Sequence, residues 1–171
     1  MELPIIARVR ATDRICGSCT ACCRTHGVSE IKKPAGKLCI HCDLGKGCKI
    51  YTNRPPSCAG FECQWLQGYG KPEDRPNRSK IVVDLCTIPI IGPIAGLWEV
   101  AGGALKESFA LWATCDILSR NIPVVLHPVS GKKTLVIPRR VVIPEDFVLG
   151  WDGMDIDMIP ESVFFKRLRV Q

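Results

Sequence analysis

The chain has 171 residues, of which 46% are hydrophobic and 23% charged, and its formal net charge is +6. These totals fit one globular domain of ordinary size and exclude a fibrous or largely disordered protein. The positive charge is confined to one half, because residues 1–80 hold 14 Lys and Arg against 7 Asp and Glu, and residues 81–171 hold 9 against 10.

The chain begins with MELPIIARVRATDR, whose apolar run is too short for a secretory signal. No stretch of about 18 apolar residues follows, so no membrane span is expected. We therefore predict a cytoplasmic protein, in which thiols stay reduced and disulfides are rare. This matters because the chain has 11 cysteines, and nine of them lie between Cys16 and Cys63. An odd number of cysteines also fits a disulfide framework poorly.

The first cysteine-rich element is CGSCTACC, from Cys16 to Cys23. Cysteines at positions i, i+3 and i+6 of a tight loop can direct three sulfur atoms at one centre, and the small residues between them let the backbone fold closely around it. Ferredoxins use a C-x2-C-x2-C run in this way. Here the next cysteine follows directly, so Cys22 and Cys23 are adjacent, and one of them is free to serve a second site.

Two further elements supply the remaining thiols. Cys39 and Cys42 form a C-x2-C pair, a spacing found in both zinc and iron–sulfur sites, and Cys48 follows in a glycine-containing loop. Cys58 and Cys63 lie in NRPPSCAGFECQWLQG, where proline predicts a helix start and Gly68 a helix end. Two cysteines five residues apart on a regular helix point in different directions, so they share a centre only if the helix is irregular there, and otherwise serve different sites.

The run C-x-x-C-x-x-C-C, followed by GCKIYTNRPPSC and a further cysteine, resembles the YkgJ-like, or CxxCxxCC, family of cysteine-cluster proteins named for zinc or iron chelation. The resemblance covers about residues 16–66, with one extra proline before Ser57. It implies a bound metal, and a related cluster in a flagellin lysine methylase implies iron–sulfur rather than zinc. The residues that match the family's cysteines are Cys16, Cys19, Cys22, Cys23, Cys39, Cys42, Cys48, Cys58 and Cys63.

The C-terminal half alternates between strand-like and helix-like patterns. β-Branched runs predict strands, and apolar residues at helical spacing predict a helix at 107–120. Asn121 suits the left-handed position that ends this helix, and Pro123 prevents its continuation. The predicted strands are 80–90, 96–101, 123–127 and 134–137, the last two forming a hairpin, and two further short helices are predicted at 144–149 and 160–168.

The sequence thus predicts an α+β fold, with an irregular cysteine-rich module and short helices packed on a small, mostly antiparallel sheet with one or two helices. We divide it into a metal-binding module at 1–68, a linker loop at 69–79 and an α+β part at 80–171, together one compact unit. The module has too little apolar periodicity to build a core of its own. Metal ligation would supply the missing folding free energy.

Residues outside the cluster give weaker signals. His26 and His41 are expected beside the metal or in solvent rather than as ligands, and His127 is expected to be structural. Cys86 and Cys115 are expected in the core, where free cysteines are common. Arg54 can donate either to cluster sulfur or backbone carbonyls, or to a surface ion pair. No dinucleotide, P-loop, HExxH or GxSxG motif occurs, so no enzyme class is predicted.

We expect a metal-binding protein with a structural, electron-transfer or metal-handling role. The cofactor is an iron–sulfur cluster or zinc, with iron–sulfur preferred because three close cysteines in one loop are typical of a cubane. Two alternatives stay open, a cluster-dependent modifying enzyme and a zinc-dependent nucleic-acid-binding module. The latter would use the basic side chains of Lys32, Lys33, Lys37, Lys46 and Lys49.

Overall fold

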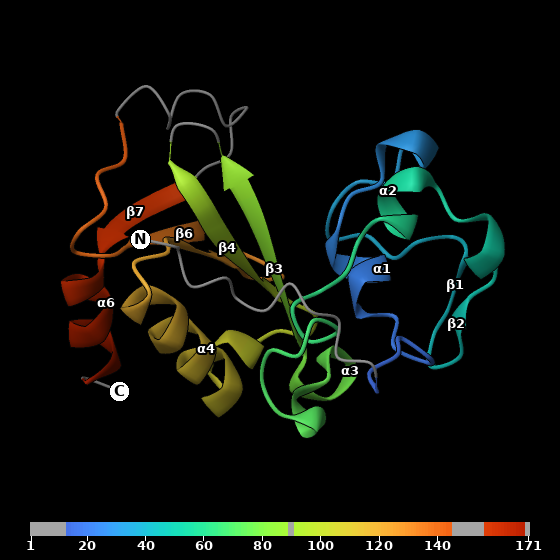
Figure 1. Cartoon of the computed structure of the whole chain (residues 1–171), viewed down its shortest axis with the longest axis horizontal. Coiled ribbons are helices and arrows are strands. Elements are labelled where there is room, and N and C mark those ends of the chain that lie inside the picture. The colour runs from blue at the N-terminus through green and yellow to red at the C-terminus, as the bar shows by residue number, and fades with distance from the viewer. Residues whose placement is uncertain (1–12, 89–90, 145–155, 170–171) are drawn as a thin grey trace.

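A computed structural model describes residues 13–88, 91–144 and 156–169. Its architecture is α+β, as the sequence predicts (Figure 1). A five-stranded sheet and two longer helices form one part, and the cysteine-rich module lies beside it. The predicted helix at 144–149 falls, except for its first residue, outside the described residues.

The sheet has the strand order β3-β4-β5-β6-β7. The strands are β3 (Ile81–Ile88), β4 (Gly92–Glu99), β5 (Val124–His127), β6 (Lys133–Ile137) and β7 (Ile156–Pro160). The β3–β4 and β5–β6 pairs are antiparallel, whereas β4–β5 and β6–β7 are parallel. The sheet is therefore mixed rather than mostly antiparallel. The first parallel pair arises because helix α4 (Ser108–Ser119) intervenes, which gives the chain the length that a parallel connection needs.

Helix α4 and helix α6 (Glu161–Leu168) cover one face of the sheet (Figure 1). Ala113 and Ile117 of α4 and Phe164 of α6 pack there against Val83, Leu97 and other buried strand residues. The end of α4 follows the predicted pattern, since Asn121 has φ 58° and Pro123 comes two residues later. A short 3-10 helix, η4 (Ala104–Lys106), fills the turn between β4 and α4.

The module is built from short pieces. These are α1 (Ala21–Thr25), η1 (Ser29–Ile31), the two-stranded hairpin β1 (Cys42–Asp43) and β2 (Gly47–Cys48), η2 (Tyr51–Asn53) and α2 (Pro56–Ala59). The predicted helix that starts at the prolines ends at Ala59 instead of reaching Gly68. Gly60 occupies its C-cap, and the chain beyond it turns toward the sheet.

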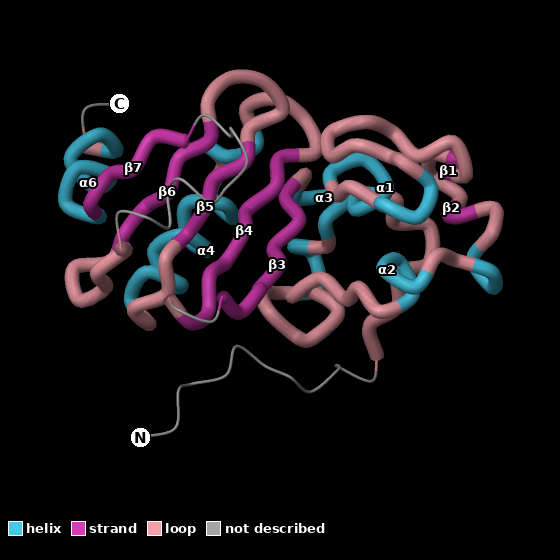
Figure 2. The backbone as a smooth tube through the Cα atoms, turned by 90° about the horizontal axis from the view of Figure 1, so that it is seen from above, coloured by secondary structure: helices cyan, strands magenta, loops and turns pink. Residues whose placement is uncertain are grey.

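The module lies along the β3 edge of the sheet (Figure 2). The Gln64 backbone N–H donates to the Val83 carbonyl at 2.8 Å, so this segment satisfies a group that an edge strand leaves unpaired. Ala21 of α1, Trp65 and Leu66 pack on Val82 in a small apolar cluster. Residues 69–79, expected as a linker loop, contain η3 (Pro72–Asp74) and α3 (Pro76–Ser79), and Tyr69 belongs to the main core. The division into domains stays a prediction.

Candidate metal centre

The Cys16–Cys23 segment forms a tight turn followed by one turn of helix. The Cys19 N–H donates to the Cys16 carbonyl at 2.8 Å, and Gly17 has φ +48°, a conformation that favours glycine. In helix α1, Ala21 and Thr25 are buried and Ala21 packs on Val82, whereas Cys22 and Cys23 are half-buried. The loop and α1 thus present their thiols to the same space.

Other segments close that space from the opposite side. The Cys39 N–H donates to the Cys23 carbonyl at 3.0 Å, and the β1–β2 hairpin pairs Cys42 with Cys48. Helix α2 supplies Cys58, and the buried Cys63 follows it in a non-helical stretch. Helix α2 ends at Ala59, before Cys63. Helical geometry therefore does not fix the directions of Cys58 and Cys63 relative to each other, and both can face the cavity.

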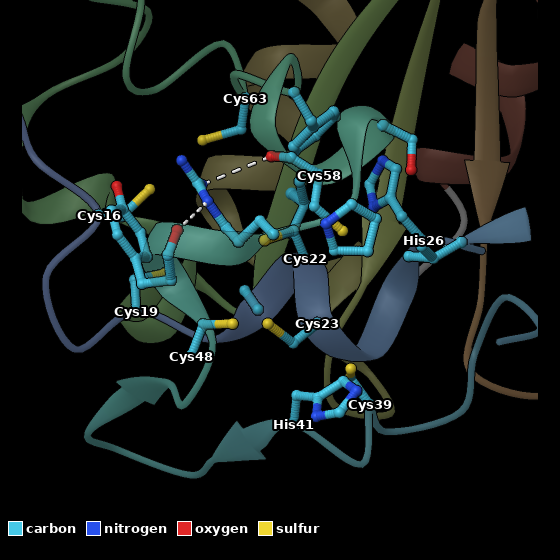
Figure 3. Close-up of a pocket in the computed structure, with 18 of the residues that line it drawn as sticks. Cys16, Cys19, Cys22, Cys23, His26, Cys39, His41, Cys48, Cys58 and Cys63 are labelled. Carbon is cyan, nitrogen blue, oxygen red and sulfur yellow. Dashed lines mark hydrogen bonds between the residues drawn. The ribbon is translucent and has the colours of Figure 1, made fainter. Parts of the chain in front are cut away.

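The thiols surround one cavity of about 300 Å³ (Figure 3). It is also lined by both module histidines and by apolar side chains such as Phe61 and Trp65. Eight of the nine predicted site cysteines line it, namely Cys16, Cys19, Cys22, Cys23, Cys39, Cys48, Cys58 and Cys63.

Cys42 is the predicted site residue that does not line the cavity. It is buried, and its thiol is hydrogen-bonded to the Thr20 and Cys23 side chains. The two cysteines outside the module lie on the sheet and on α4. Cys86 is exposed, so its expected place in the core is wrong: it lies near the far end of edge strand β3, whose last residues are only partly covered. Cys115 is half-buried.

The Cys23 and Cys63 thiols of the cavity are poor acids in this arrangement. The pKa of Cys23 is raised well above its usual range, first by the hydrogen bond with Cys22 and then by burial. Burial raises the pKa of Cys63 to about 11, although the backbone N–H groups of Leu66 and Trp65 donate to its sulfur and act in the opposite direction. A cation placed among such thiols removes the mutual repulsion and favours thiolates. The arrangement therefore suits a bound cation better than free thiolates.

A buried ammonium group lies on one side of the cavity. Lys33 is only 9% exposed, and its Nζ donates to the backbone carbonyls of His26 and Pro34. Burial lowers its pKa, whereas the nearby thiols oppose this shift. A buried cation needs an anion nearby, and a metal centre held by thiolates is such an anion. The nucleic-acid hypothesis counted Lys33 among its surface cations, and the structure places this side chain inside instead.

Arg54 and Tyr51 form a second wall of the cavity. The guanidinium lies 3.9 Å from the Tyr51 ring centroid, and its Nε donates to the Tyr51 carbonyl at 3.0 Å. A weaker contact of 3.5 Å joins Nη1 to the Cys58 carbonyl. Arg54 thus donates to backbone carbonyls, which was one of the two roles that the sequence left open.

His26 connects the cavity to the sheet. Its Nε2 lies 2.9 Å from Oδ2 of Asp84 on β3, and its Nδ1 lies 2.7 Å from the Thr25 hydroxyl. The ring also packs on Phe61 and Trp98, with centroids 4.5 and 4.7 Å away. Neither Asp84 nor Thr25 stands out in the sequence as a site residue. Side chains alternate between the two faces of a strand, so Asp84 lies on the same face of β3 as Val82. This alternation is the sequence signal that could have identified Asp84 as a neighbour of the site.

The lining thiols form no single-metal site in the part of the chain that the structure describes. Sulfur atoms on one tetrahedral zinc lie about 3.8 Å apart, given Zn–S bonds of about 2.3 Å. Within residues 13–88, 91–144 and 156–169, no three His, Cys, Asp or Glu side chains gather in an arrangement that could hold a metal ion.

Comparison with family models, with curated proteins and with solved structures finds no match to this chain. The likeness to the CxxCxxCC family therefore stays a prediction from the motif. None of the helices in the described part of the chain is long and apolar enough to cross a membrane.

Proposed function

We propose that this protein is a metal-binding protein whose N-terminal thiolates hold an iron–sulfur centre. The observation that carries the proposal is the convergence of eight cysteines, drawn from the Cys16–Cys23 segment, the 39–48 region and residues 58–63, on one cavity. Such a cluster supplies one-electron transfer when it is bound. It also supplies order, because thiolate–metal bonds replace the apolar contacts that the module lacks.

The surroundings of the sulfurs support iron–sulfur over zinc. Backbone N–H groups donate to the Cys63 sulfur, and hydrogen bonds of this kind help set the reduction potential of a cluster. The Lys33 ammonium offsets negative charge on the other side of the cavity. Eight thiols line the cavity, twice the number that one tetrahedral zinc takes, which suits several metal atoms better than a single ion.

The test is iron, zinc and acid-labile sulfide analysis of the full chain purified without oxygen. We expect a brown protein in which iron and sulfide are present in equal amounts. A colourless protein with stoichiometric zinc would overturn the iron–sulfur assignment. A metal-free sample with a fully folded module would overturn metal binding altogether.

A variant pair sharpens this test. Cys19→Ser is expected to lose metal together with the folded structure of the module, because Cys19 lies in the turn that begins the site. Cys115→Ser is the matched control, since Cys115 lies on α4, outside the cavity lining. Equal metal content in the two variants would contradict the assignment of Cys19.

A further inference from the structure

The module holds most of the large apolar side chains that the described residues leave in solvent. Nine such side chains are exposed in the described part of the chain, and five of them lie between residues 15 and 51. These five are Ile15, Leu38, Ile40, Leu44 and Tyr51. Single exposed apolar residues are normal on a protein surface, but a gathering of them in one small region is typical of an interaction site.

Two of these side chains stand at the tips of tight turns. Ile40 lies in a turn closed by the Cys42 N–H and the Cys39 carbonyl at 3.0 Å, and it is 80% exposed. Leu44 lies in the turn that joins β1 to β2 and is 61% exposed. Turns usually place glycine or small polar residues at such tips, because these residues suit the backbone there. An aliphatic side chain does nothing for the turn, so its position favours contact with a partner.

Hydrogen bonds make this region a fixed surface. The Lys49 N–H donates to the His41 carbonyl at 2.8 Å, and the pairing of β1 with β2 continues from there to the turn. Four residues of chain span at most about 14 Å, so Ile40 and Leu44 fit within one contact surface. The hairpin forms the end of the molecule away from the sheet (Figures 1 and 2).

The exposed charges near the two tips are mostly positive. Residues 32–51 hold one carboxylate, Asp43, and four exposed lysines, Lys32, Lys37, Lys46 and Lys49. Lys46 lies 3.5 Å from Asp43, whereas Lys37 and Lys49 form no salt bridge with any described residue. These ammonium groups lie in solvent rather than at the cavity, where Lys33 is buried, so they can meet an anionic partner.

An anionic lipid surface fits this combination better than a protein or a nucleic acid. The core of a protein interface is closely packed, so each protruding tip would need a pocket of its own shape in the partner. A lipid interface yields to protruding side chains instead. Nucleic-acid interfaces are strongly polar and give exposed aliphatic tips no matching contact. A second copy of the same basic surface would be repelled, because like charges would face each other.

We propose that the β1–β2 hairpin is a docking surface for an anionic lipid membrane. Ile40 and Leu44 enter the boundary between headgroups and acyl chains, while Lys37, Lys46 and Lys49 meet the lipid phosphates. Such a contact lies on the membrane without spanning it, and it is reversible because few side chains enter. The same hairpin forms one wall of the thiol cavity, so docking brings the cavity to the membrane surface. The inference goes beyond the proposed function and does not depend on which metal is bound.

The first test is sedimentation of the full chain, purified without oxygen, with lipid vesicles. We expect it to sediment with vesicles that mix phosphatidylglycerol with phosphatidylcholine, and to stay in solution with phosphatidylcholine alone. Ile40→Ser and Leu44→Ser should each weaken binding about tenfold, because an inserted aliphatic side chain is lost. Neither residue lines the cavity, so both variants should keep the metal content of the wild type. Val142→Ser, which alters an 88% exposed aliphatic residue elsewhere, is the matched control.

The outcomes separate the possible partners. No sedimentation with the mixed vesicles, or equal binding by the wild type and both tip variants, would overturn the proposal. Binding to transfer RNA without binding to vesicles would overturn it in favour of a nucleic-acid interface. Lys37→Gln and Lys49→Gln should each weaken vesicle binding about fivefold at low salt. Lys166→Gln, on α6, is their control, and a loss as large in this variant would mean that overall charge is responsible.

The second test uses the unaltered chain, so it does not depend on variants that fold. Hydrogen exchange is followed with and without the mixed vesicles. We expect exchange to slow within residues 37–49 and to stay the same in α4 and α6. Slower exchange in those helices with no change in the hairpin would show that another face binds, and would contradict the proposal.

Discussion

His127 is a buried imidazole that the fold holds in its neutral form. It is 7% exposed and stacks on Trp98, with ring centroids 3.5 Å apart and planes 8° from parallel. Burial lowers its pKa to about 3, and Lys133 contributes in the same direction. Its Nδ1 has no hydrogen-bond partner among the described residues. The structural role that the sequence predicted for His127 thus takes the form of a stacking contact on the sheet.

This burial predicts a loss of stability in mild acid. The unfolded chain takes up a proton near pH 6.5 and the folded chain only near pH 3, so the free energy of unfolding falls as the pH drops between these values. The contribution of His127 is about 2 kcal/mol between pH 7.5 and pH 5. His127→Phe keeps a stacking ring without a titratable group. Urea unfolding at the two pH values should show a drop that is smaller in this variant by that amount. Equal drops would mean that His127 is protonated in the folded state.

Gly96 is required by the side chains that lie over it. It is paired with Asp84 across β3 and β4, and a Cβ atom there would overlap Oδ1 of Asp84 and lie 2.6 Å from Nε1 of Trp98. We expect Gly96→Ala to lower the free energy of unfolding by about 1–3 kcal/mol, as overpacking does, and to displace Asp84 from His26. Urea unfolding and the His26 ring signals in NMR report the two effects. Gly102→Ala is the control, because nothing lies within 4 Å of its added methyl group.

At the scale of elements, the link between η1 and α2 fixes the position of Cys58. Glu30 accepts from the Ser57 N–H at 2.9 Å and from its hydroxyl at 2.8 Å. The Ser57 N–H is the main reason that the pKa of Glu30 is lowered to about 2. Because the pKa of Glu30 is lowered, the stabilisation by its hydrogen bonds to Ser57 is fully present above the ordinary carboxyl pKa. It is lost as the pH falls through about 2, where Glu30 becomes protonated in the folded chain.

Glu30→Gln should loosen the start of α2 without unfolding the sheet. A neutral amide accepts hydrogen bonds more weakly than a carboxylate. We expect the Ser57 amide to exchange with solvent several times faster at neutral pH, as measured by hydrogen exchange. Glu73→Gln in η3 removes a carboxylate from another short helix and should leave Ser57 unchanged. If both variants exchange at the wild-type rate, the carboxylate is not what holds α2 in place.

The sequence predicted the elements of the two parts unequally well. Strand β3 and helices α4 and α6 match their predicted ranges closely. A run of β-branched residues marks the strand, and apolar residues at helical spacing mark α4. The module has no such period. Its longest predicted helix ended after Ala59, since the residues beyond it are held by the sheet edge rather than by helical hydrogen bonds.

At the scale of the whole molecule, the two parts have very different cores. The main core joins the sheet to α4 and α6 and includes fully buried residues such as Leu97 and Ile117. The cluster under the module is small and includes only Ala21, Cys63, Trp65, Leu66 and Val82 as buried members. The sheet part can therefore stay folded when the module loses its order.

Removing the metal should unfold the module and leave the sheet intact. Treatment with a chelator under reducing conditions is expected to abolish hydrogen-exchange protection in residues 16–63, because binding free energy is folding free energy there. Protection in α4 and β5 should persist, since their contacts contain no cavity cysteine. The same chelator saturated with iron is the control. Protection that survives in both parts, or disappears from both at once, would contradict this division of stability.

The sequence alone determined the α+β class, helices α4 and α6, strands β3 to β6 and the concentration of thiols, because hydrophobic pattern and residue type are local properties, whereas strand β7 was not predicted. Only the tertiary structure decided which thiols line one cavity, that Cys42 is not among them, and that His26 contacts Asp84, 58 residues further along the chain. Those facts depend on hydrogen bonds between distant segments. Examples are the bond from the Gln64 N–H to the Val83 carbonyl and the bond from the Arg14 side chain to the Trp65 carbonyl. No periodic pattern in the chain encodes such hydrogen bonds, since each forms only when both segments are already in place.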